Sequence, residues 1–245
     1  MANIKTRARQ RGDHYVVTGS KTYITSGVRA DQLTCAVRTG GEGYGGLSLL
    51  IIPSDSPGYS VSEKLRKMGW WASDTAQIFF DECRIPVDNL LGEEGQGFYG
   101  IMENFQRERL HLAVMANMTA RMALEASLRY AQERKAFQRP IAGFQVTRHK
   151  LADMATQVEI SQEFTYRIAA KMDAGLSQVK EIAMAKNFAC SVGDRVTYDA
   201  VQIHGGAGYM REYPVERLYR DNRILSIGGG TQEIMKEIIG KMILQ

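Results

Sequence analysis

The sequence predicts an α+β fold in two domains: a small antiparallel β-barrel or sandwich, followed by an up-down four-helix bundle. Short runs of β-branched and aromatic residues, broken by turn residues, continue to about Leu91. After Gly95-Gln96-Gly97 the apolar residues change to helical spacing, and long helical segments alternate with short loops. With 44% hydrophobic residues, both parts have enough apolar material for a core. We therefore expect a β-domain over residues 1–95 and a bundle over residues 96–245.

Six short runs are expected to form the strands of the β-domain. Glycine, serine and proline separate them, as is typical of strands joined by tight turns. The segment Leu47–Ile52 is almost continuously apolar, which indicates a strand covered on both faces. The six runs are His14–Thr18, Lys21–Thr25, Leu33–Arg38, Leu47–Pro53, Tyr59–Ser62 and Gln77–Phe80.

The second part contains three long helical segments and two shorter ones. The expected ranges are 98–135, 145–173, 178–203, 214–223 and a last helix that begins at residue 231. Gly175 should end the second helix in a left-handed conformation. Ser177 and Thr231 are the residues that we expect to cap the third and the last helix, because a hydroxyl accepts from the free N–H groups there.

Composition and charge exclude several classes of protein. The net charge of +4 comes from 31 basic and 27 acidic residues that are mixed along the chain. This mixing predicts neither a nucleic-acid tail nor a membrane-binding patch. The slight excess of basic residues suits acidic ligands. The three cysteines have no metal-ligand spacing, so we expect no metal and a reducing compartment. Neither a signal peptide nor a membrane span is predicted. The chain opens directly on strand-like sequence, which we interpret as a cut.

Three glycine clusters need separate interpretation. Gly41, Gly43 and Gly46 spell GxGxxG, but they lie between two strand-like runs, so a hairpin loop is favoured over a dinucleotide-binding turn, which must enter a helix. The clusters at 205–208 and 228–230 each lie at a helix end. There the backbone N–H groups could meet a phosphate or an oxyanion, or the glycines could only form sharp corners. Local sequence leaves both interpretations open.

Several stretches resemble, in order and spacing, the acyl-CoA dehydrogenase family. They cover nearly the whole chain, and so many in the correct order exclude coincidence. The stretches are Lys21-Thr22-Tyr23-Ile24-Thr25-Ser26-Gly27, Cys83-Arg84-Ile85-Pro86, Asn89-Leu90-Leu91-Gly92-Glu93-Glu94, Glu133-Arg134-Lys135-Ala136-Phe137, Pro140-Ile141, Phe144-Gln145, Gln202-Ile203-His204-Gly205-Gly206, Gly208-Tyr209, Tyr213-Pro214-Val215-Glu216-Arg217 and Arg220-Asp221. The resemblance implies a subunit with an N-terminal helical domain, a middle β-domain and a C-terminal bundle, of which this chain would have the last two.

The same resemblance implies FAD-dependent α,β-dehydrogenation of a fatty acyl-CoA, in which a carboxylate removes the α-proton. Most of the family has its glutamate just before a Gly-Thr pair that opens the last helix, and Gly229 occupies that position here. The long-chain and isovaleryl branches instead have it on the first bundle helix in a Glu-Arg-Leu context, which Glu108-Arg109-Leu110 resembles. We therefore interpret Glu108 as the catalytic base and not as an ordinary solvated glutamate on the helix surface. Gly229 would offer its N–H to the thioester oxygen.

Further site residues are implied by the resemblance. Tyr23, Ile24 and Thr25 should contact the flavin ring. For the adenosine-diphosphate half of FAD we expect Arg134, Phe137, Gln145, Gln202, Ile203, His204, Gly205 and Gly206, with His204 serving in local packing. Thr231, Gln232 and Glu233 should open the last helix beside FAD, and Tyr99, Arg109, Gly229 and Gly230 are the expected substrate contacts.

The implied partners are an acyl-CoA substrate, electron transfer flavoprotein as oxidant, and copies of the same chain in a homotetramer or homodimer. The implied pathway is fatty-acid β-oxidation, in bacterial cytoplasm or, for a eukaryotic source, in the mitochondrial matrix. Two alternatives remain open: an acyl-CoA oxidase or a monooxygenase on the same scaffold, and a scaffold that has lost its flavin. The acyl chain is not determined, although the position of the base favours long or branched chains.

Overall fold

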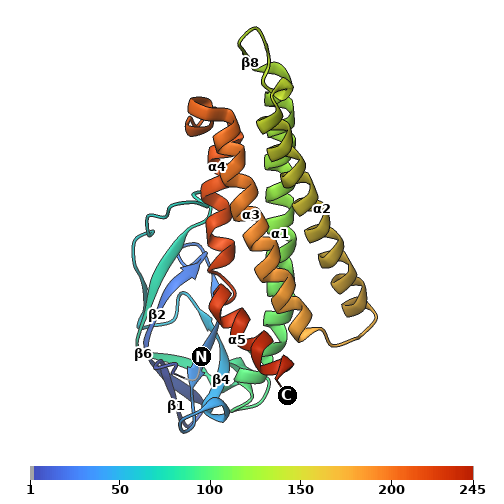
Figure 1. The fold of residues 1–245 in the computed structure, drawn as a ribbon. Coiled ribbons are helices and arrows are strands. Elements are labelled where there is room, and N and C mark those ends of the chain that lie inside the picture. Colours follow the sequence, from blue (N-terminus) through green and yellow to red (C-terminus); the bar gives the residue numbers. More distant parts are fainter. Residues whose placement is uncertain (1–2, 245) are drawn as a thin grey trace. The chain divides into compact units, whose positions relative to one another are not determined.

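A computed structural model describes residues 3–244, and the chain forms two compact units, Met1–Asn104 and Phe105–Gln245. Figure 1 shows strands in the first unit and long helices in the second. This division confirms the predicted α+β class. The two units are described separately below.

One mixed sheet of seven strands forms the first unit. Its strand order is β5-β6-β2-β1-β3-β4-β7, and all neighbours are antiparallel except β1 and β3, which are parallel. The strands are β1 Arg7–Arg11, β2 His14–Thr25, β3 Gln32–Arg38, β4 Leu47–Pro53, β5 Tyr59–Val61, β6 Thr75–Pro86 and β7 Leu90–Leu91. Apolar side chains of the central strands, including Val17, Val37, Leu50, Ile52 and Ile78, make its core.

Two sequence predictions about this sheet were wrong in detail. Strand β1 was not among the six assigned runs, because its sequence is mostly arginine and glutamine. It is nevertheless a strand because it pairs with β2 along its whole length. Two predicted runs, His14–Thr18 and Lys21–Thr25, form the single strand β2, which continues through Gly19 by means of two register shifts against β6.

Five α-helices lie in the described part of the chain after the sheet, up to residue 244. They are α1 Gly97–Glu133, α2 Gln145–Asp173, α3 Val179–His204, α4 Pro214–Asn222 and α5 Gln232–Ile243. The hairpin β8 Lys135–Ala136 and β9 Arg139–Pro140 joins α1 to α2. Gly175 has a φ of 75°, which confirms the expected end of α2. Ser177 was wrongly assigned as the cap of α3, whose N-cap is Gln178 without a side-chain hydrogen bond.

The fourth segment of the bundle is interrupted. Both α4 and α5 pack on α3, but residues 223–231 separate them (Figure 1). The core of the unit lies between the long helices and contains many alanines, such as Ala120, Ala123 and Ala200, which allow close approach of the helix backbones. The interruption brings a non-helical segment with three glycines against the inner helices.

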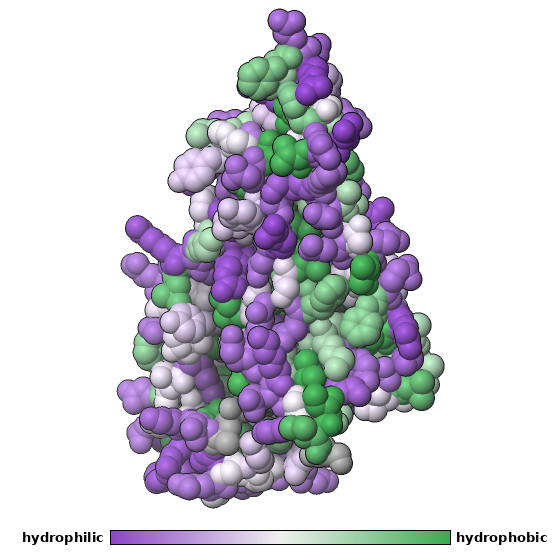
Figure 2. Space-filling view, in the orientation of Figure 1, coloured by the Kyte–Doolittle hydropathy of each residue, from purple (hydrophilic) through white to green (hydrophobic). Residues whose placement is uncertain are grey.

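Large apolar side chains are also exposed on the helical unit. Ile160 and Tyr166 of α2 and Phe188 of α3 are exposed, and Figure 2 shows apolar residues gathered over the α2 and α3 side of this view. No helix in residues 3–244 is long and apolar enough to cross a membrane.

Candidate active site

The segment between α4 and α5 is fixed to α3 by a row of polar contacts. Asp194 accepts hydrogen bonds from Asn222 Nδ2 (2.8 Å) and Ser226 Oγ (2.7 Å). Cys190 Sγ donates to the carbonyl of Leu225 at 3.2 Å. These contacts pair the amide N–H of Asn222, the hydroxyl of Ser226 and the thiol of Cys190. The segment that interrupts the bundle is therefore held in a defined position by side chains of α3.

Two glycines follow in this segment, and their carbonyls are held by two basic side chains. Gly229 and Gly230 have φ values of 63° and 110°, conformations that glycine adopts without steric cost. Arg109 Nε donates to the carbonyl of Gly229 at 3.1 Å. Lys186 Nζ donates to the carbonyl of Gly230 at 2.6 Å. The start of α5 is thus tied to α1 and α3 at the same point.

Both basic groups are withdrawn from solvent. Arg109 is 5% exposed and Lys186 is 0% exposed. Burial lowers the pKa of each, and the neighbouring positive charge of Arg109 lowers the pKa of Lys186 further. Arg109 also lies 5.3 Å from the centroid of the Phe105 ring, which offers its negative face to the guanidinium. Two cationic groups thus lie beneath the glycines.

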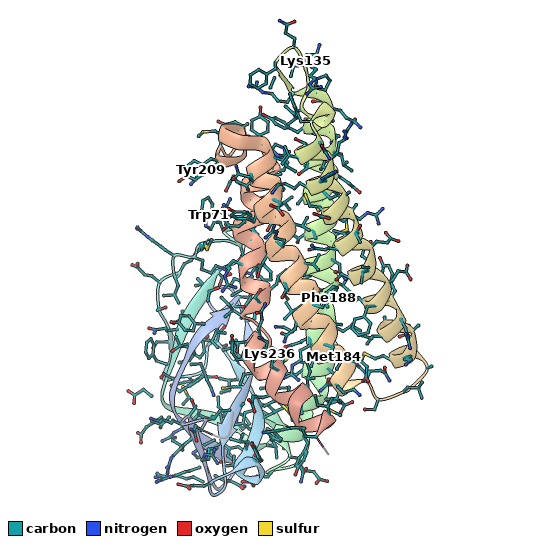
Figure 3. The ribbon with its side chains drawn as sticks, viewed as in Figure 1. Trp71, Lys135, Met184, Phe188, Tyr209 and Lys236 are labelled. Atoms are coloured by element: carbon teal, nitrogen blue, oxygen red, sulfur yellow. The ribbon has the colours of Figure 1, made fainter. Side chains whose placement is uncertain are left out.

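Lys186 was not among the residues predicted from the sequence. Figure 3 marks Met184 and Phe188 on α3, which lie two residues before and two residues after Lys186. Residues two positions apart on a helix do not share a face, so Lys186 points in another direction than these two. Lys186 instead shares the buried face with Ile182 and Cys190, which lie four residues away on either side. That spacing was a usable signal: a lysine in the middle of an apolar helical stripe.

Glu108 lies on the part of α1 that faces residues 228–230, the glycine turn before α5. A Cβ atom placed on Gly229 would be 2.7 Å from Leu112 Cδ1 and 3.9 Å from Arg109 Cγ. Glu108 is one helical turn before Leu112, on the same face, so the structure brings Glu108 and Gly229 to one region. Glu108 itself is exposed. Because the position of Gly229 has a positive φ and is crowded by Leu112, a larger side chain would be strained there.

The expected flavin-ring contacts lie in the sheet unit. The second register shift of β2 falls between Lys21 and Ile24, and Tyr23 within it has a φ of 61° and is 77% exposed. Ile24 packs against the sheet core, and Thr25 is exposed. Tyr23 thus offers an aromatic face outside the sheet. Tyr99, at the start of α1, also belongs to this unit and is exposed.

The residues expected around the adenosine diphosphate fall into two groups at one end of the bundle. Arg134, Phe137 and Gln145 are all exposed on or beside the β8–β9 hairpin. Phe137 has a positive φ at the tip and is 91% exposed. Its ring is 6.2 Å from that of the half-buried Phe144, which opens α2 and lies under the guanidinium of Arg139. Arg134 and the ring of Phe137 are thus exposed to a ligand or to another protein chain.

The second group is the C-terminal end of α3. Gln202, Gly205 and Gly206 are exposed, and Ile203 is half-buried. His204 is buried, stacked on Tyr130 with ring centroids 4.2 Å apart, and Nδ1 donates to the Ala200 carbonyl. This places His204 in packing and not on the surface.

The first turn of α5 carries the remaining predicted residues. Thr231 is its N-cap, as expected, and its hydroxyl accepts from the N–H of Ile234 at 3.4 Å. The carbonyl of Gln232 accepts from Asn187 Nδ2, and Glu233 is exposed. The hydroxyl of Thr231 also lowers the pKa of Glu233, after the larger effect of a backbone hydrogen bond.

Acid is expected to weaken the helical unit through His204. Burial lowers its pKa below the ordinary value of 6.5, and the hydrogen bond to Ala200 opposes this only in part. As the pH falls below about 6.5 the unfolded chain binds a proton that native His204 does not, so stability is lost. His204→Phe retains a stacking ring and removes the titration. Its thermal midpoint should change less between about pH 7 and about pH 5 than that of the parent; an equal change would contradict the assignment.

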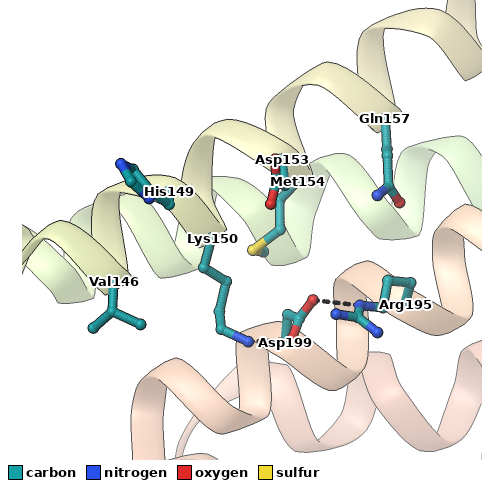
Figure 4. A pocket seen from close by; sticks show the side chains of 8 residues that line it. All are labelled: Val146, His149, Lys150, Asp153, Met154, Gln157, Arg195 and Asp199. Carbon is teal, nitrogen blue, oxygen red and sulfur yellow. Dashed lines mark hydrogen bonds and ion pairs between the residues drawn. The ribbon is translucent and has the colours of Figure 1, made fainter.

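A pocket elsewhere on the unit contains none of the predicted residues. It lies between α2 and α3, has a volume of about 250 Å³ and is shown in Figure 4. Asp199 on its floor accepts from both Lys150 (2.5 Å) and Arg195 (2.8 Å). The charges of these three residues are thus already paired, as in a structural ion-pair network. In residues 3–244 no group of three His, Cys, Asp or Glu side chains has the arrangement of a metal site.

Comparison with known proteins gives matches over the whole chain. The model for "Acyl-CoA dehydrogenase, middle domain" matches residues 1–83, and that for "Acyl-CoA dehydrogenase, C-terminal domain" matches residues 95–244. An acyl-CoA dehydrogenase of Bacillus subtilis is 42% identical over 99% of this chain and 64% of its own length. The mitochondrial long-chain specific acyl-CoA dehydrogenase of Sus scrofa is 36% identical over the full chain and 57% of its own length.

A solved structure is similar in the same way. The crystal structure of a probable acyl-CoA dehydrogenase from Mycobacterium abscessus superimposes with a TM-score of 0.97 at 55% identity, and the match covers 98% of this chain and 64% of that one. The chain therefore spans less than two thirds of the length of these relatives.

Proposed function

Because the chain belongs to the acyl-CoA dehydrogenase family, we propose that it forms the middle and C-terminal domains of an enzyme that oxidises a fatty acyl-CoA to the trans-2-enoyl-CoA. The observation that carries the proposal is the arrangement around Gly229. Glu108 lies one helical turn from Leu112, the residue nearest to Gly229, and Gly229 itself has no side chain that could act as a base. Glu108 is thus the carboxylate that we assign to this part of α1.

Glu108 is proposed to remove the α-proton of the substrate. Its exposed position allows a bound thioester to reach it. As the proton leaves, negative charge grows on the thioester oxygen, and a backbone N–H directed at that oxygen stabilises it. The glycine turn offers such N–H groups, and Arg109 and Lys186 beneath it add positive charge. A second glutamate at position 229 would repel Glu108, so the two positions are consistent with each other.

Residues of each unit, taken separately, suit parts of FAD. Bound FAD would supply the acceptor for the β-hydride. Tyr23, raised from the sheet by the register shift, can pack on a flat ring system. Arg134 can pair with a pyrophosphate, and the free N–H groups in the first turn of α5 suit an anionic or polar group. The exposed ring of Phe137 is suited to a planar base.

Partners and compartment complete the proposal. We expect electron transfer flavoprotein to reoxidise the enzyme and several copies of the chain to assemble, either as a homotetramer or as a homodimer. The exposed apolar side chains of α2 and α3 would supply an assembly surface. The proposed setting is β-oxidation in a bacterial cytoplasm or in a mitochondrial matrix.

A substrate panel tests the proposed reaction. The full-length protein, loaded with FAD, is mixed without oxygen with saturated acyl-CoAs of different length and branching. We expect bleaching of the oxidised flavin spectrum and formation of the trans-2-enoyl-CoA. Admission of air then distinguishes a dehydrogenase, which stays reduced until electron transfer flavoprotein is added, from an oxidase, which is reoxidised rapidly. Absence of bleaching with every thioester, by protein that has retained FAD, would reject the proposal.

A further inference from the structure

The peptide planes of the two glycines before α5 are held by side chains of other helices. Without a Cβ atom, Gly229 and Gly230 have access to many backbone conformations, so the peptide planes around them are not fixed by local sterics. In the structure, however, each carbonyl has a single buried cationic partner, Arg109 for Gly229 and Lys186 for Gly230. The orientation of these peptides is therefore set from outside the segment.

The carbonyl contacts also direct the N–H groups. In a trans peptide the C=O and the N–H point in opposite directions. The bond from Arg109 to the Gly229 carbonyl thus turns the N–H of Gly230 away from Arg109, and the bond from Lys186 to the Gly230 carbonyl turns the N–H of Thr231 away from Lys186. Within residues 3–244 neither N–H has an acceptor. Both are free to meet a ligand.

Attachment of the segment does not require Lys186. The contacts from Asp194 and Cys190 already hold residues 222–226, and Asn187 holds Gln232 by a bond of 3.1 Å. Lys186, by contrast, is completely buried on α3 next to the apolar residues Ile182, Ala183 and Ala189, where an ammonium group is costly. Because the other contacts already attach the segment, the buried ammonium group of Lys186 indicates a role beyond packing.

We propose that Lys186 is a positioning residue for the reaction: by holding the carbonyl of Gly230 it fixes the Gly230–Thr231 peptide, and with it the N–H groups of residues 229–231 that are offered to the thioester oxygen. The inference rests on the proposed function of the site. Lys186 acts through the backbone and does not touch the reacting atoms. Its removal should weaken stabilisation of the enolate-like charge more than binding of the uncharged substrate.

The variant Lys186→Met retains a side chain of similar length without the donor. In full-length, FAD-loaded protein we expect kcat to fall about 10- to 100-fold with KM changed less than about 3-fold. A 3-oxoacyl-CoA, which forms a stable enolate, gives a second readout by its absorbance. The pKa of the bound ligand should rise by about 1 to 2 units, the same 10- to 100-fold factor. Lys186→Gln, which keeps an N–H donor, should give smaller changes in both measurements.

The matched control is Asn187→Ala, which removes a neighbouring contact from α3 to the start of α5. It should lower thermal stability without changing the pKa of the bound 3-oxoacyl-CoA. If Lys186→Met behaves in the same way, Lys186 is only structural and the inference is overturned. Should Lys186→Met fail to fold, Lys186→Leu, which also removes the donor, is judged by the same criterion. The ligand measurement does not use Glu108, so a failure of the proposed base and a failure of this inference give different results.

Discussion

Glu108→Gln is expected to abolish exchange of the substrate α-proton while FAD remains bound. The amide has the shape of the carboxylate but cannot accept the proton, and a general base contributes up to about 10⁴-fold to the rate. With Gly229 at the other family position, no second carboxylate can take over the task. We therefore expect kcat to fall by about 10⁴-fold in full-length protein, measured by flavin reduction and by deuterium uptake at the α-carbon.

The control for this variant is Glu125→Gln on the same helix. Glu125 forms a surface ion pair with Arg121, so the same chemical change there should leave turnover intact. Unchanged flavin absorbance in both variants would show that the cofactor site is preserved. Appreciable α-proton exchange by Glu108→Gln would reject Glu108 as the base, even if the family and the overall reaction were correct.

The helices could be predicted well because their signals are local. Apolar residues at helical spacing and the glycines that end each segment predicted α1, α2 and α3 to within a few residues. Strand β1 could not be predicted in this way. Its residues are polar, and it is a strand only because β2 supplies a hydrogen-bonding partner. The continuity of β2 through Gly19 likewise depends on register shifts against β6.

The candidate site was predictable only in part, for a related reason. Family resemblance indicated Glu108 and Gly229, and the caps of α5 followed from local chemistry. Arg109 is expected to contact substrate, and in the structure it is buried with Nε on a carbonyl 120 residues further along the chain. Lys186 reaches its partner across 44 residues. No local pattern specifies such distant pairs, because they depend on how α1 and α3 pack around the interrupted segment.

Arg109→Met is expected to reduce kcat by about 10²- to 10³-fold, the effect of losing one preorganised contribution to an oxyanion site. The change removes the bond to the Gly229 carbonyl and a buried positive charge. An unpaired buried carbonyl costs roughly 1–3 kcal/mol of stability. That cost is partly offset, because the charge of Arg109 lowers the pKa of Lys186 and its removal relieves the repulsion between them. The unit should therefore stay folded while activity is lost.

Two controls separate this role from general packing. Arg107→Met on the exposed side of α1 removes the same kind of charge, and should change neither kcat nor the unfolding midpoint appreciably. Arg109→Lys keeps the charge but lacks the Nε donor, so we expect only partial recovery. Full recovery in Arg109→Lys would mean that charge alone matters.

The double variant Arg109→Met with Lys186→Met decides whether the two residues act together. They hold adjacent peptides of one glycine turn, so once either is lost the turn is already free to reorient. We therefore expect the combined loss in kcat to be well below the product of the single losses, as for residues that act as a unit. If the losses multiply, the two cations act independently on the reaction, and the turn does not need both to hold its shape.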